Sequence, residues 1–225
     1  MPEDVTSKLR DSALYRIAKD VGFNARVEPL WYTYRRLESG MGFFEKHRER
    51  RRLRRIVEGV NAGLRAAGAA VSAWDDRPGA CVCNLRVAKI GLLRELKTYV
   101  EERSGADAPT RWPHVFALRD RPCLLVPLEF PRPLTADPGG REEPFPAASS
   151  MNARRELGEI NERLRIDETF ALKKMVDYLD ATERDISIYE SRFGTSEGFW
   201  PKFCYVLIKK IVDVSAEKGL PAILV

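Results

Sequence analysis

Apolar residues recur at helical spacing through residues 42–69, and the opposite side of the same segment carries arginines. With 3.6 residues per turn, one stripe of the helix holds Leu53, Ile56, Val57, Val60 and Leu64. A helix with one apolar face must bury that face against another element. The spacing therefore predicts a long amphipathic helix packed on a core.

The same spacing predicts further helices and leaves room for a sheet in the middle of the chain. Helices are expected over residues 3–21, 29–40, 86–103, 157–178 and 197–218, the fourth with a possible second start at Asp167. Strands are expected over residues 80–85, 114–118, 123–130 and 222–225, the second and third forming a hairpin. Pro127 has no amide donor, so its strand should lie at an edge or end nearby. The expected class is α+β, predominantly helical, with a small mixed or antiparallel sheet from the central segment.

Residues 131–150 have the composition of a linker, because they hold five prolines and the pair Gly139-Gly140. We expect an exposed excursion here, separating an α/β portion, residues 1–130, from a helical portion, residues 151–225. The apolar end of the chain needs a sheet to pair with, and residues 80–130 supply one. The whole of residues 1–225 is therefore expected to form a single domain.

The positive charge of the chain is concentrated in the long helix. The formal net charge is +5, and residues 45–55 alone hold seven Lys or Arg against two Glu. Arg48, Arg51, Arg52 and Arg55 cluster on the side opposite the apolar stripe. Guanidinium groups form bidentate bonds to phosphate, so this face is a candidate anion-binding site. The competing interpretation is a solvated helix face balanced by acidic residues elsewhere.

Aromatic residues precede this helix beside two more arginines. Trp31, Tyr32 and Tyr34 could stack on nucleic-acid bases if they pack near the basic helix, with Arg35 and Arg36 adding to the anion-binding site. The alternative is that these aromatic side chains belong to the core.

One acidic set would suit a metal-dependent enzyme. Asp75, Asp76 and Glu129 could hold Mg²⁺ through carboxylate oxygens and so support phosphodiester hydrolysis. The Glu-x-Lys strand common in α/β nucleases is missing, since Phe130 and Pro131 follow Glu129. The competing interpretation makes the two aspartates part of a turn and Glu129 a polar residue on an edge strand.

The four cysteines are expected to be reduced, largely buried thiols without a bound metal. Cys81-x-Cys83 with His114 and Cys123 offers ligand types that zinc accepts, but the spacing does not match a structural zinc site, and Cys204 lies far along the chain. Neither a Walker-type nor a dinucleotide-binding glycine motif occurs. No cofactor is therefore predicted.

Together these features predict a noncatalytic binding protein. Its partner would be anionic, most simply DNA or RNA, with a metal-dependent phosphodiesterase or nuclease, or a subunit docking on an acidic protein surface, as alternatives. The longest apolar runs are far shorter than a membrane span, and the first residues lack a secretory signal, so we expect a cytoplasmic location and no membrane partner. The sequence indicates no oligomeric state.

Overall fold

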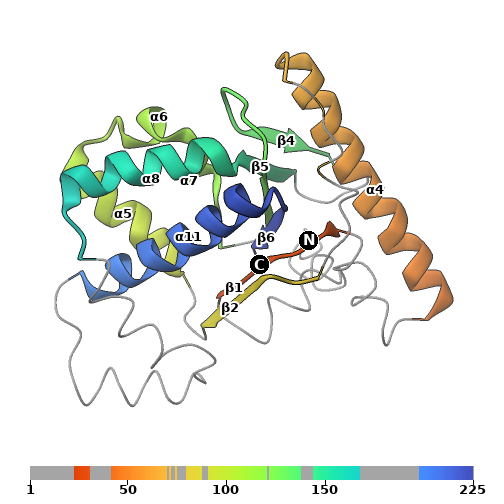
Figure 1. The fold of residues 1–225 in the computed structure, drawn as a ribbon, viewed down its shortest axis with the longest axis horizontal. Helices are drawn as coiled ribbons and strands as arrows, with labels where there is room; N and C mark the ends of the chain where they lie inside the picture. The colour runs from red at the N-terminus through yellow and green to blue at the C-terminus, as the bar shows by residue number, and fades with distance from the viewer. Residues whose placement is uncertain are drawn as a thin grey trace, which may run out of the picture.

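The computed structural model describes residues 23–30, 42–69, 71, 74, 80–87, 91–120, 122–137, 144–167 and 198–224. A six-stranded mixed sheet runs through these residues (Figure 1). Its strands are β1 (Phe23–Val27), β2 (Cys83–Val87), β3 (Cys123–Val126), β4 (Leu134–Ala136), β5 (Phe145–Ser149) and β6 (Ala222–Leu224). Their order across the sheet is β2-β1-β6-β3-β5-β4. Only the β3–β5 pair is parallel within this sheet.

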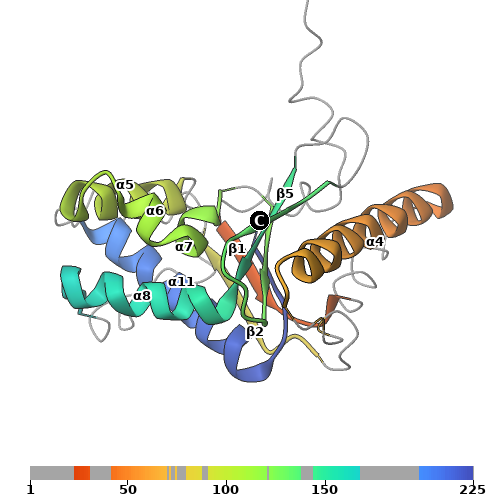
Figure 2. The same ribbon diagram turned by 90° about the horizontal axis from the view of Figure 1, so that it is seen from above.

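Helices lie on both sides of the sheet, which gives the described part of the chain three layers (Figure 2). On one side is α4 (Phe43–Ala66). The other side holds α5 (Leu92–Ser104), α6 (Ala108–Arg111), α7 (Pro113–Ala117), α8 (Ser150–Leu164) and α11 (Phe199–Lys218). Helical residues outnumber strand residues, and the α+β class is confirmed. No helix in the described ranges combines the length and apolar character needed to cross a bilayer.

Two apolar cores flank the sheet, and β3 contributes to both. Leu124 and Val126 belong to the core beneath α4, whereas Cys123 and Leu125 belong to the core beneath the other helices. Successive side chains of a strand point to opposite faces, so a strand covered on both faces is apolar throughout. This explains the unbroken Cys-Leu-Leu-Val sequence.

The strand β6 joins two halves of the sheet. It pairs antiparallel with β1, where Ala25 lies opposite Leu224, and with β3, where Leu125 lies opposite Ala222. The expectation that this late strand would pair with the central sheet is confirmed. The helix before it ends as predicted, at Gly219 with a φ of 61°, a conformation that glycine adopts without strain.

The hairpin predicted for residues 114–130 is wrong in its first strand. Residues 113–117 form the short helix α7, which Pro113 begins. Proline suits the first turn of a helix, and the carboxylate of Glu156 accepts the N–H groups of His114 and Val115. A five-residue apolar run does not by itself distinguish a buried strand from a short buried helix.

The second strand of that hairpin, β3, ends at Val126, just before Pro127. The predicted end near the proline is therefore confirmed. The alternative edge position is wrong, because β3 pairs with β5 on one side and β6 on the other. A proline beyond the last paired residue removes no hydrogen bond from the ladder.

The exposed excursion predicted over residues 131–150 is also wrong in part. This segment supplies β4 and the fully buried β5, and residues 138–143 lie outside the described part. Pro146 is tolerated inside β5, where it lies opposite Thr135 of β4. Phe145 and Ala147 face the core beneath α4, so the proline-rich composition conceals an apolar strand.

Several predicted elements fall outside the described residues. These are the helix over 3–21, most of the helix over 29–40, the turn at 75–79 and the part of the 157–178 helix beyond residue 167. Within the described part, α8 ends at Leu164, and Arg165 adopts a left-handed conformation with a φ of 49°.

Candidate functional site

The basic face of α4 is exposed over most of its predicted extent. Arg48, Arg51 and Arg55 are exposed, and within the described part of the chain none of them forms an ion pair. Arg50 and Arg54 are exposed on the same helix. We call these five residues the arginine surface.

Arg52 departs from the prediction. It is 9% exposed and forms an ion pair with Glu49 at 3.5 Å between Nη1 and Oε2. The buried stripe of α4 is centred on Ile56, Val60 and Leu64, and Arg52 lies only about 40° from Ile56 around the helix axis. Arg52 is therefore on the buried side, and its charge is balanced by a carboxylate of the same helix.

The other residues of the predicted anion-binding site, Arg35 and Arg36, lie outside the described residues, as do the predicted stacking residues Trp31, Tyr32 and Tyr34. Their proximity to the arginine surface stays a prediction.

The predicted acidic site is not assembled by the described residues. Asp75 and Asp76 lie outside them, and Glu129 forms an ion pair with Arg155 at 3.3 Å. The side chain of Glu129 is 68% exposed. Across the described ranges, no group of three or more His, Cys, Asp or Glu side chains is arranged to hold a metal ion.

All four cysteines are free thiols. Cys123 and Cys204 are buried, and burial raises the pKa of each above its ordinary value, to about 11 for Cys123. Cys81 and Cys83 are half-buried, and burial raises their pKa values too. A raised pKa keeps each sulfur in the neutral form, which is a poor nucleophile and a poor metal ligand.

A cleft that no sequence pattern predicts opens at the carboxyl ends of the parallel strands β3 and β5. Its volume is about 610 Å³. Four segments line it: the turn after α4 at Ala67–Ala69, the α6–α7 region, the loop after β3 at Glu129–Arg132, and one face of α8. Ligands of open α/β sheets commonly bind outside the carboxyl ends of parallel strands.

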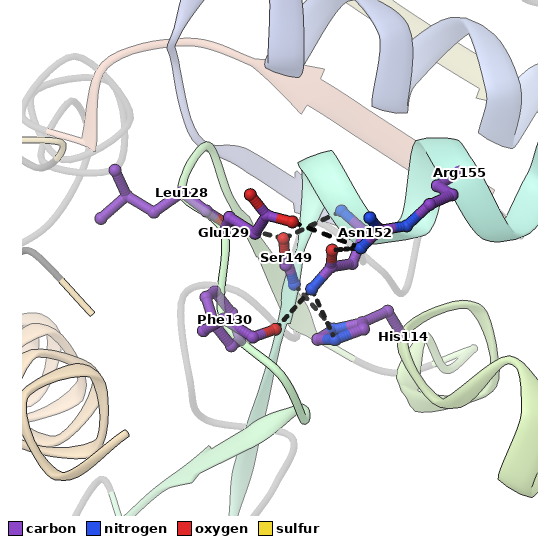
Figure 3. Close-up of polar contacts among 7 residues, drawn as sticks. All are labelled: His114, Leu128, Glu129, Phe130, Ser149, Asn152 and Arg155. Carbon is purple, nitrogen blue, oxygen red and sulfur yellow. Dashed lines mark hydrogen bonds and ion pairs between the residues drawn. The ribbon is translucent and has the colours of Figure 1, made fainter. Parts of the chain in front are cut away.

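The base of this cleft is a hydrogen-bonded network around His114 (Figure 3). The ring Nδ1 accepts the backbone N–H of Ser149 at 3.0 Å, and the side-chain amide of Asn152 donates to the carbonyl of Phe130. Arg155 reaches from α8 to both the Asn152 side-chain oxygen and Glu129. The network fixes the loop after β3 against α7 and α8.

His114 is neutral in this network. It is 1% exposed, and burial lowers its pKa to about 4. Because Nδ1 accepts a hydrogen bond, the ring proton of the neutral imidazole lies on Nε2. His114 contacts Ser149 through the backbone N–H of the serine, while the hydroxyl of Ser149 donates to the carbonyl of Leu128 at 2.6 Å. The pair is therefore not arranged as a serine nucleophile with its base.

Glu156 joins α8 to the start of α7. Its carboxylate accepts the N–H of His114 at 3.1 Å and the N–H of Val115 at 2.7 Å. Burial nevertheless raises the pKa of Glu156 to about 7, and the nearby charge of Glu159 acts in the same direction. The two N–H donors oppose this rise.

The sequence contained a partial signal for this region. Ser149 is the N-cap of α8, and its hydroxyl oxygen accepts the N–H of Asn152 at 3.0 Å. A serine directly before a helical pattern predicts such a cap. The contacts of His114 with Ser149 and of Glu156 with α7 join residues distant in sequence, so no local pattern identifies them.

Comparison with protein-family models, curated proteins and solved structures gives no match to this chain.

Proposed function

We propose that this protein binds nucleic acid through the arginine surface of α4, without catalysing a reaction on it. The observation that carries the proposal is the exposure of Arg48, Arg51 and Arg55 with no ion pair to any described residue. An exposed guanidinium without a carboxylate partner is available to phosphate oxygens, and the counterions it displaces from the nucleic acid add to affinity.

The packing of α4 supports the proposal. Ile56, Val60 and Leu64 anchor one side of the helix in the core beneath α4, between the helix and the sheet. The arginines therefore project from an element held in place by packing, so binding need not order the helix backbone. DNA and RNA both carry the phosphate backbone that this surface would contact. We propose that this binding takes place in the cytoplasm.

The proposal predicts a strong and specific dependence of binding on salt. Replacing Arg48, Arg51 and Arg55 together by Gln should weaken binding to a DNA duplex and reduce the slope of log K against log salt by about 2.7, since each lost phosphate contact contributes about 0.9. The measurement is a fluorescence-anisotropy titration at several salt concentrations. It should be repeated with a single-stranded RNA.

A matched control distinguishes the effect of the arginine surface on binding from the effect of net charge. Arg94, Arg119 and Arg163 are exposed residues outside α4, and their replacement by Gln removes the same three charges. The control variant should retain most of the affinity and salt slope. Equal losses in the two variants would contradict the proposed surface, and cleavage of the duplex dependent on a divalent cation would contradict the noncatalytic assignment.

A further inference from the structure

We propose that the cleft at the carboxyl ends of β3 and β5 is a second binding site, for a small organic molecule that carries a phosphate or carboxylate group. Its volume of about 610 Å³ falls within the range of small-molecule pockets. This site is separate from the arginine surface, and the proposal does not depend on nucleic-acid binding.

The base of the cleft is held by hydrogen bonds among its own residues. His114 and Asn152 are 1% and 5% exposed, and each is hydrogen-bonded to the backbone of a neighbouring segment. The bond from Asn152 to Phe130 holds the loop after β3 in place, and Arg132 is carried on that loop. A preformed site loses little conformational entropy when it binds.

The acidic groups of the cleft already have hydrogen-bond or ion-pair partners. Glu156 accepts two backbone N–H groups, and Glu129 pairs with Arg155. Glu159 accepts the indole N–H of Trp112 at 2.9 Å. The ion pair with Arg155 balances the charge of Glu129, and the raised pKa of Glu156, about 7, reduces its mean negative charge near neutral pH.

The arginines of the cleft retain donors. Arg132 is exposed and forms no ion pair with a described residue. Arg111 pairs with Asp107 through Nη2, and its side chain also lines the cleft. Because the remaining donors belong to guanidinium groups, the complementary ligand presents anionic oxygens.

A few apolar residues offer a surface for an organic body on the ligand. Pro113, Pro131 and the alanines just after α4, Ala67 and Ala69, border the cleft, within a lining that is mostly polar. An anionic group held by the arginines would leave the rest of the molecule against these apolar side chains.

The test is calorimetric titration of the full chain with phenyl phosphate, benzoate and inorganic phosphate. We expect saturable binding of phenyl phosphate or benzoate and weaker binding of inorganic phosphate. The organic probe that binds more tightly identifies the anionic group of the ligand as a phosphate or a carboxylate. Arg132→Gln should reduce the affinity for the tighter probe at least tenfold. The control Arg119→Gln removes an exposed arginine outside the cleft and should change the affinity less than twofold.

Three results would overturn the inference. These are no saturable binding of either organic probe, equal losses in the Arg132 and Arg119 variants, or inorganic phosphate binding as tightly as the organic probes. The α4 variant with Arg48, Arg51 and Arg55 replaced by Gln should bind the probe normally. Loss of nucleic-acid binding and loss of probe binding are thus observed separately.

Discussion

The buried residues His114 and Glu156 have opposite effects on stability as pH changes. The folded state lowers the pKa of His114 from 6.5 to about 4 and raises that of Glu156 from 4.5 to about 7. As pH rises between about 4 and 6.5, the unfolded chain holds the histidine proton more tightly, so stability rises. As pH rises between about 4.5 and 7, the folded chain holds the glutamate proton more tightly, so stability falls. Each effect amounts to about 3 kcal/mol, and the two largely cancel where the windows overlap.

Single substitutions should separate these two effects. In Glu156→Gln, the free energy of unfolding should increase as pH rises from about 4 to 6.5, because only the histidine contribution remains. In His114→Gln, it should decrease as pH rises from about 4.5 to 7. Urea denaturation at a series of pH values measures both slopes relative to the wild-type protein. Parallel pH profiles for the three proteins would contradict this account.

The helix α4 approaches β4 closely because glycines face the strand. A Cβ atom on Gly59 would lie 3.1 Å from the Ala136 Cβ and 3.3 Å from the Ala136 Cα. Alanine in a helix is about 1 kcal/mol more favourable than glycine, but here the strand backbone would have to move. We therefore expect Gly59→Ala to lower the free energy of unfolding by about 1 kcal/mol in denaturant titrations.

Gly158 supplies the matched control. It lies inside α8 with nothing within 4 Å of its Cβ position, so Gly158→Ala should stabilise the protein by about 0.5–1 kcal/mol. A similar increase in the free energy of unfolding in both variants would contradict this account, because it would show that β4 can move away from α4 at no cost in free energy.

The sequence predicted elements best where one pattern ran for several turns. The apolar stripes of α4 and α11 extend far enough to identify each helix, and Gly219 marks the end of the second. Short elements were harder to predict. The helix α7, for example, depends on Pro113 at its start and on Glu156, which belongs to another helix. The strand β5 contains Pro146, which by itself indicates a loop. The ladder with β3 begins only at Ala147, and the strand is buried between the two cores.

The two candidate sites also differ in how far the sequence predicts them. The exposure of Arg48, Arg51 and Arg55 follows from helical spacing. The burial of Arg52, at the margin of the apolar stripe, depends on which side of α4 faces the sheet. The cleft was not predictable, because its lining comes from four segments that only the fold brings together.

The sheet should hold together the parts of the chain that precede and follow residues 138–143. The strand β5 pairs with β3 and β4, and β6 pairs with β1 and β3, so both later strands are bound to earlier ones. If a specific protease site replaces residues 138–143, the two fragments produced by cleavage should elute together in size-exclusion chromatography without denaturant. Separation of the fragments would show that the segments before and after the cut fold independently.

The place of β6 also determines the order in which the molecule can be built during synthesis. A ribosome releases β1, β2, β3, β4 and β5 before β6, which arrives roughly a hundred residues after β3 and therefore roughly 5–20 s later. Throughout that interval β1 and β3 each lack the neighbour that will lie between them. The nascent chain thus carries two incomplete sheets with unpaired backbone edges, which are surfaces that chaperones or other chains can bind.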